Sequence, residues 1–168
     1  MTDFTPDWDR RVADHWRRID DFAEDAFCAT LETLLVELPD GSPTASFERA
    51  AVFDSFGHAD RAVPIYQTAL ADGLDGERRR RAVIQMSSSM RNLGDAQRAV
   101  DLLTAELALP ADHLTGAVHA TLALALTDVG RTREAVAVAV TALAAYLPRY
   151  NRSMARYAAA LMTDGAGH

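Results

Sequence analysis

Residues 57–70 read GHADRAVPIYQTAL, and this stretch decides the fold because the chain repeats it. The pattern returns at residues 94–107 as GDAQRAVDLLTAEL and, in weaker form, at residues 130–136 as GRTREAV. The three leading glycines lie 37 and 36 residues apart. A repeat of this length is typical of helix pairs stacked in an array, in which each pair buries its apolar face against the next.

Apolar spacing and turn residues around the glycines predict helices in pairs. Gly57 and its two equivalents supply the left-handed residue that ends the first helix of each pair. Ser42 with Pro43 has the pattern of an N-cap followed by the first helical residue. We expect one domain, residues 1–168, with an N-terminal helical cap at 1–41 and three helix pairs at about 43–72, 76–109 and 112–147. A C-terminal capping helix at about 149–163, opened by Asn151, and a frayed tail from Thr163 to His168 complete the prediction.

The N-terminal segment carries both tryptophans of the chain. From Trp8 to Leu38 the apolar residues recur at helical spacing. Asp21 followed by Glu24 has the pattern of a capping pair, which divides the segment into two helices near that point; a single helix is the alternative. Trp8 and Trp16 share one stripe. The stripe is core if the segment packs as a cap, and a dimerisation or partner surface if the segment projects.

The repeats resemble the tetratricopeptide repeat, a helix pair of about 34 residues. The second helix of that repeat carries a small residue, a bulky apolar residue one turn later, then a small residue and a leucine. Those positions hold Ala62, Tyr66, Ala69 and Leu70; Ala99, Leu103, Glu106 and Leu107; and Ala135, Ala139, Ala142 and Leu143. The first helices also fit at Ala50 and Phe53, Ser87 and Met90, and Ala123 and Leu126. An expected aromatic residue is replaced by Ser46, Val83 and His119.

Three further segments are similar to short stand-alone bacterial members of the same family: FERAAVFDS (47–55), ERRRRAVIQ (77–85) and SSMRNLG (88–94). The resemblance covers residues from about 43 to about 147. It implies an all-α, right-handed superhelical solenoid whose first helices line a concave face. It also implies a non-enzymatic role in binding another protein.

The composition narrows the classes of function. The 168 residues carry a net charge of −7 and include no lysine, and residues 1–40 hold 11 acidic residues and 4 arginines. Binding to nucleic acid needs a basic face, so we expect no nucleic-acid partner. No apolar run approaches the roughly 20 residues of a membrane span. The lone Cys28 and the acidic N-terminus predict a cytoplasmic protein without a signal peptide.

No residue cluster predicts catalysis, a metal site or a cofactor. Cys28 is flanked by apolar residues at helical spacing, which is typical of a buried small hydrophobe. The serines at 87–89 lack the sharp strand-to-helix turn of a nucleophile elbow. His113 and His119 lie six residues apart, on different sides of a helix, and no neighbour completes a set of metal ligands. We therefore predict no enzyme; an unrecognised hydrolase or metal enzyme is the least favoured class.

The strongest candidate for a binding site is a polar stripe on the first helix of the middle pair. Four of its residues fall at i, i+4, i+7 and i+11 and a fifth lies beside them: Arg81, Gln85, Ser88, Asn92 and Arg91. Three polar residues of the flanking pairs complete the predicted groove: Asp54, Thr127 and Asp128. Such mixed polarity suits an extended peptide or a partner helix; a solvated face is the alternative. The carboxylate clamp of chaperone-binding members of the family is absent, because its positions hold Phe47, Ala51, Gln85, Ala117 and Thr121.

The run of four arginines from Arg78 to Arg81 is the strongest charged feature of the sequence. For the run from Arg78 to Arg81, one interpretation is local pairing with acidic neighbours, and the other is an anionic ligand. The neighbours are Asp72, Asp75 and Glu77.

Three arginines give the last helix a basic face opposite in sign to the N-terminal region: Arg149, Arg152 and Arg156. Our prediction is an interaction scaffold; the alternative is a homodimer formed through Trp8, Trp16 and these arginines.

Overall fold

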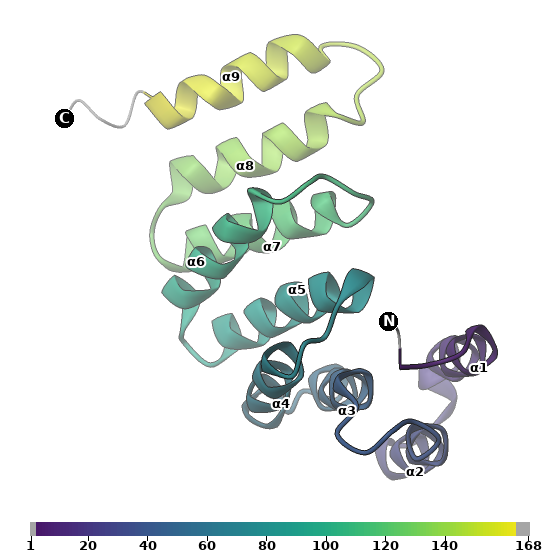
Figure 1. The fold of residues 1–168 in the computed structure, drawn as a ribbon. Coiled ribbons are helices and arrows are strands. Elements are labelled where there is room, and N and C mark those ends of the chain that lie inside the picture. The colour runs from purple at the N-terminus through teal and green to yellow at the C-terminus, as the bar shows by residue number, and fades with distance from the viewer. Residues whose placement is uncertain (1–2, 164–168) are drawn as a thin grey trace. The chain divides into compact units, whose positions relative to one another are not determined.

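The computed structural model describes residues 3–163, and all of them are helix, turn or loop (Figure 1). The all-α prediction is confirmed. The predicted frayed tail, apart from Thr163, lies outside the described residues. The helices are α1 (Pro6–Trp16), the short 3-10 helix η1 (Ile19–Asp21), α2 (Glu24–Leu35), α3 (Pro43–Ser55), α4 (Ala59–Ala71), α5 (Gly76–Asn92), α6 (Ala96–Leu107), α7 (Thr115–Asp128), α8 (Thr132–Ala144) and α9 (Asn151–Thr163).

The contacts between Cα atoms divide the chain into two compact units, residues 1–82 and residues 83–168. The boundary falls inside α5. The first unit holds α1 to α4 and the first turns of α5. The second unit holds the remainder of α5 and α6 to α9.

The same glycine turn ends the first helix of every pair, as the sequence predicts. Gly57 has φ 84, and its N–H bonds to the carbonyl of Asp54 at 3.0 Å. The N–H of His58 reaches back to the carbonyl of Phe53 at 2.8 Å, which completes a Schellman motif. Equivalent bonds close the turns at Gly94 and Gly130, which have φ 85 and 78. This recurrence explains why the repeat is visible in the sequence.

We expect Gly94→Ala to lower the free energy of unfolding by roughly 1–2 kcal/mol, because an L side chain disfavours the left-handed region. A Cβ at Gly94 would meet nothing within 4 Å, so the lower free energy of unfolding would come from the strained backbone conformation and not from a clash. The control is Gly116→Ala inside α7. A Cβ there lies 3.3 Å from the Oη of Tyr146, an exposed side chain that can move aside. Urea unfolding followed by circular dichroism measures both, and an equal loss in the two variants would contradict the argument.

The N-terminal segment forms two helices, α1 and α2, joined by η1. The break falls where the sequence places it, but the expected capping pair is wrong. Ala23 is the N-cap of α2 and makes no side-chain bond, whereas the carboxylate of Asp21 accepts from Arg18 at 3.1 Å. Asp21 closes η1 and therefore lies too early in the chain to cap α2. The predicted cap at Ser42 is confirmed, since its Oγ accepts from the N–H of Ala45 at 3.0 Å.

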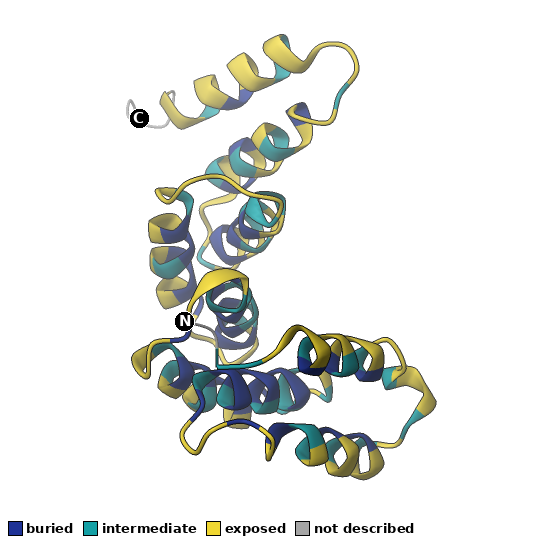
Figure 2. Ribbon diagram, turned by 45° about the vertical axis from the view of Figure 1, so that its right-hand side comes forward, coloured by how far each residue is buried: buried dark blue, intermediate teal, exposed yellow. Residues whose placement is uncertain are grey.

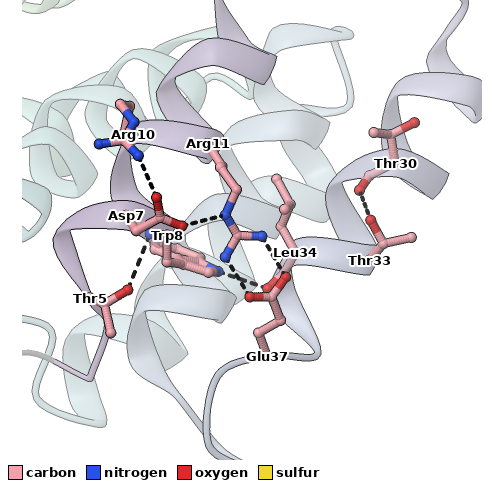
Figure 3. Close-up of polar contacts among 9 residues, drawn as sticks. All are labelled: Thr5, Asp7, Trp8, Arg10, Arg11, Thr30, Thr33, Leu34 and Glu37. Atoms are coloured by element: carbon pink, nitrogen blue, oxygen red, sulfur yellow. Dashed lines mark hydrogen bonds and ion pairs between the residues drawn. The ribbon is translucent and has the colours of Figure 1, made fainter.

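One core cluster of the first unit is built from α1, α2 and α3. Phe27 lies at its centre, fully buried, with its ring stacked on His15 at a centroid distance of 4.0 Å and tilted against Trp16 at 5.1 Å. The ring of Trp8 is 2% exposed, and its indole N–H donates to the carbonyl of Leu34 at 2.8 Å (Figure 3). Trp8 therefore belongs to the interior of this unit, while Trp16 is half-buried.

A surface bridge accompanies this packing. The guanidinium of Arg11 bonds to the carboxylate of Glu37 at 2.7 Å and to Asp7 at 3.1 Å, so it ties α1 to the end of α2 (Figure 3). The hydrogen bond from Arg11 holds the pKa of Glu37 below its ordinary value. Both groups are exposed, so the bridge orients the helices more than it stabilises them.

In the second unit, α6 packs against α7, α7 against α8, and α8 against α9. The repeated positions do not behave alike. Tyr66, in the first unit, and Leu103 are fully buried, but their equivalent in the third copy, Ala139, is exposed. Glu106, which replaces a small residue of the pattern, is buried. The third copy therefore keeps the helix pair but loses the large apolar contact.

Candidate functional site

The second unit brings together part of the predicted groove. The Nε of Arg91, at the end of α5, donates to the carboxylate of Asp128, at the end of α7, at 2.6 Å. The hydroxyl of Thr127 is directed to its own helix, where it bonds to the carbonyl of Ala123 at 2.9 Å. Asn92 is exposed, whereas Gln85 and Ser88 are half-buried. An ion pair between the ends of α5 and α7 therefore neutralises part of this polar surface.

In the first unit, Arg81 and Asp54 flank the buried Tyr66. Burial raises the pKa of the Tyr66 phenol, the negative charge of Asp54 raises it further, and Arg81 opposes both. The guanidinium of Arg81 lies over the ring of Phe47, 5.2 Å from its centroid. Within residues 3–163 this guanidinium makes no ion pair with a carboxylate. Arg81 is thus held against an aromatic face, and its planar fork of N–H groups can donate to an acceptor.

Arg81 lines a pocket of about 530 Å³ within the first unit, here called the cap pocket. Its walls come from α1, α3 and the start of α5. The lining residues are Phe4, Asp9, Val12, Ala13, Trp16, Arg17, Thr44, Glu48, Asp75, Gly76, Glu77, Arg78 and Arg81. The pocket therefore combines apolar side chains with charges of both signs.

A buried ionic network closes one side of the cap pocket. Glu48 is 1% exposed and accepts from the indole N–H of Trp16 at 2.7 Å and from the Nε of Arg78 at 2.9 Å. Arg78 also bonds to Asp9 at 2.5 Å, and its guanidinium lies 4.5 Å from the ring centroid of Phe4. Burial lowers the pKa of Arg78, but the carboxylates of Glu48 and Asp9 outweigh it, so the net shift is upward. The network joins α1, α3 and α5.

This network corrects one hypothesis about the arginine run. For Arg78 the sequence suggested pairing with Asp72, Asp75 and Glu77, but the observed partners are Asp9 and Glu48. Asp9 and Glu48 lie 69 and 30 residues from Arg78 in the sequence, so the spacing of neighbouring residues does not predict these pairs. The only signal for Glu48 is its spacing, because it lies three residues after Ala45 and four before Val52, both of which are core.

Asp3 adds a pH-dependent contact beside the cap pocket. Its carboxylate accepts from the hydroxyls of Ser42 and Thr44, the latter at 2.6 Å. Burial raises the pKa of Asp3, but these bonds outweigh it and hold the pKa below its ordinary value of 3.8. The stabilisation is therefore complete above pH 3.8 and is lost as the pH falls through the lower folded-state pKa.

We expect Asp3→Asn to lower the free energy of unfolding at pH 6 by up to about 1 kcal/mol, since solvent screens this half-buried carboxylate. The difference from the wild type should shrink as the pH is lowered below 3.8, where the native carboxyl is also neutral. Denaturant titrations at a series of pH values measure this. Asp40→Asn, at an exposed loop position, is the control. A difference that is constant with pH would contradict the assignment.

The residues of the self-association hypothesis lie in different surroundings. The side chain of Trp8 is interior, and the indole N–H of Trp16 is bonded to Glu48. Arg149, Arg152 and Arg156 are exposed on or beside α9, and the guanidinium of Arg156 lies 5.5 Å from the ring centroid of Tyr157.

The metal-ligating side chains and the single cysteine were the candidates for chemistry among the described residues. Among residues 3–163, no group of three or more His, Cys, Asp or Glu side chains could hold a metal ion. Burial raises the pKa of the Cys28 thiol, and the nearby carboxylates of Glu24, Asp25 and Glu32 raise it further, which disfavours the reactive thiolate. None of the described helices is both long enough and apolar enough to cross a membrane.

The chain contains successive helix pairs, and in each pair the same glycine turn joins the two helices. This arrangement defines a helical-repeat protein. The family model described as "Tetratrico peptide repeat" matches residues 43–161, so the chain belongs to the tetratricopeptide repeat family. The match extends past the third pair and includes most of α9. Repeats of this family serve protein–protein interaction. Searches of the curated proteins and of the solved structures each returned no match.

Proposed function

We propose that the chain is a non-enzymatic interaction scaffold of the cytoplasm that binds a peptide or a helix of another protein. The observation that carries the proposal is the cap pocket, in which Arg81 faces the space without a carboxylate partner among the described residues. Family membership supports the general role. One residue of the predicted groove, Arg81, and residues of α1 contribute to this site.

The chemistry of the cap pocket suits a partner segment of mixed polarity. Arg81 can donate to a carboxylate or backbone carbonyl of the partner through its planar fork of N–H groups. Asp75, exposed at the start of α5, can accept from a basic side chain. Phe4 and Trp16, both half-buried, offer apolar surface in the lining. An extended peptide or a helix with neighbouring acidic, apolar and basic residues would match all three.

Apart from Asp54, the remaining groove residues form a second candidate surface in the second unit. Arg91 and Asp128 neutralise each other there, so a partner would gain little from either charge. Asn92 offers an exposed amide, and Ser88 a half-buried hydroxyl. We propose that these residues can add hydrogen bonds to a ligand bound at this second surface.

Site-specific photo-crosslinking in the native cell tests this proposal. A photoreactive residue at Ala13, exposed in the lining of the cap pocket, should capture a defined partner protein. The same residue at Ala29, exposed on α2 and outside the pocket, should not. Adding Arg81→Glu should abolish the product at Ala13. A product that forms equally at both positions, or that survives Arg81→Glu, would count against the cap pocket.

A further inference from the structure

Exposed apolar side chains are distributed unevenly over the described residues. Ten large hydrophobic residues are exposed, and Val36 is the single one of them in the first unit. The terminal units of a repeat array normally have a polar outer face, which prevents association. The first unit follows this rule, whereas the second unit does not. Six of the exposed residues gather on the last two helices and the turn between them: Val136, Leu143, Tyr146, Tyr150, Tyr157 and Met162.

The α8 stripe, defined as Val136, Ala139, Leu143 and Tyr146, runs along one side of α8 and into the following turn. The first three lie at i, i+3 and i+7 and so share a helix face. Val136 is 46% exposed, Leu143 56% and Tyr146 74%. The equivalents of Ala139 in the earlier copies, Tyr66 and Leu103, are fully buried. In this copy the large side chains lie on the outside of the helix.

Helix α9 packs against α8 and leaves most of its own surface exposed (Figure 2). Ala158 is its one buried residue, and Tyr157 is 57% exposed. Three exposed arginines lie on or just before α9: Arg149, Arg152 and Arg156. Residues 135–163 contain no Asp or Glu, although the whole chain has a net charge of −7. Glu134, in the first turn of α8, is paired with Arg131. The α8–α9 surface, meaning the α8 stripe together with the three arginines, is therefore apolar and basic.

We propose that the α8–α9 surface binds an amphipathic helix of a different protein, with an apolar face for the α8 stripe and acidic residues for the three arginines. Tyrosine and arginine are the residue types that contribute most to protein interfaces, because they provide large contact areas and directional donors. A helix laid along two neighbouring helices buries its apolar face, and its flanking carboxylates set the orientation. This surface is separate from the cap pocket.

A second copy of the chain is a poorer occupant. Its first unit is acidic, but Val36 is its single exposed large hydrophobic side chain among the described residues. Pairing of residues 149–163 with the same segment of a second copy would bring six arginines together with no carboxylate from residues 135–163. An anionic membrane is also less suitable. Interfacial helices carry their apolar and basic residues on opposite faces of one long helix, whereas the α8 stripe and the arginines here belong to two helices.

The test uses the full chain and a fluorescent synthetic helix. The peptide, of about 18 residues, carries Leu at i, i+3, i+4 and i+7 and Glu at the positions that flank this apolar face. Anisotropy should show saturable binding, and a scrambled peptide of the same composition should bind at least about tenfold more weakly. Leu143→Ser with Tyr146→Ser should weaken binding about tenfold, and so should Arg152→Glu with Arg156→Glu. These positions are exposed, so the fold should survive, which circular dichroism checks.

Val36→Ser and Arg10→Glu are the matched controls, because both change exposed residues of the first unit. They should leave the affinity within about twofold. Equal binding of the scrambled peptide, or affinity unchanged by both patch variants, would overturn the proposal. Sedimentation on phosphatidylserine vesicles that is lost in the arginine variant would assign the surface to membranes instead. A dimer that dissociates on Leu143→Ser would assign it to a second copy.

Discussion

Glu48→Ala is expected to lower the free energy of unfolding by about 3–5 kcal/mol, a large share of the stability of a small protein. Removing this carboxylate leaves the guanidinium of Arg78, 13% exposed, without its buried partner, and deprives the indole N–H of Trp16 of its acceptor. Asp9, whose side chain is 47% exposed, stays beside Arg78 but compensates its buried charge only in part. A poorly compensated buried charge costs more than the ion pair itself contributes. Urea unfolding followed by fluorescence measures the loss, since both tryptophans of the chain lie in α1.

Two variants separate the buried charge from other causes. Glu32→Ala removes the partner of Arg49 in an ion pair whose side chains are 40% and 47% exposed, so it should cost no more than about 1 kcal/mol. The double change Glu48→Leu with Arg78→Met replaces the buried pair with apolar groups and should recover most of the loss. If Glu48→Ala lowers the free energy of unfolding no more than Glu32→Ala does, the buried ionic network does not contribute strongly to the stability of the first unit.

Phe27→Ala is expected to cost about 3–5 kcal/mol for a different reason, the cavity left in the core. Phe27 is fully buried, and its ring contacts aromatic side chains from α1 and from the residues that follow η1 and α3: His15, Trp16, Phe22 and Phe56. Loss of this ring should also shift the fluorescence of Trp16, whose ring centroid lies 5.1 Å away. Denaturant unfolding and emission spectra measure both effects.

Tyr150→Ala is the matched control for Phe27→Ala, because it truncates an aromatic ring that is 75% exposed. Its cost should lie within about 0.5 kcal/mol of zero. A small loss in Phe27→Ala would mean that the surrounding rings close the cavity. The N-terminal helices would then depend less on this residue than its burial indicates.

The helix pairs could be predicted from the sequence because their signals are local. A left-handed glycine, a Ser-Pro N-cap and apolar spacing each act within a few residues, so Gly57 and Ser42 have the predicted roles. The predicted cap at Asp21 was wrong because the 3-10 helix that intervenes ends on it. Propensity alone does not reveal such a short element.

The candidate site was predictable only in part, because its contacts join distant segments. Arg81 was expected at a binding surface, but the pocket that surrounds it also needs α1, whose position depends on the bonds from Trp16 and Arg78 to Glu48. Arg91 was expected to be available to a ligand, and the structure pairs it with Asp128 instead. Polar spacing indicates which residues share a face, but it does not show which of them neutralise one another.

The most direct test of the interaction function is the dissociation constant of the partner captured at Ala13, measured by calorimetric titration against the full chain. Arg81→Glu should weaken that binding by at least about tenfold, because it replaces the donor in the cap pocket with a like charge for the partner's carboxylate. Arg98→Glu, an exposed change on α6 outside the pocket, should leave the constant within about twofold. Equal constants for the wild type and Arg81→Glu would contradict the assignment of the cap pocket as the binding site.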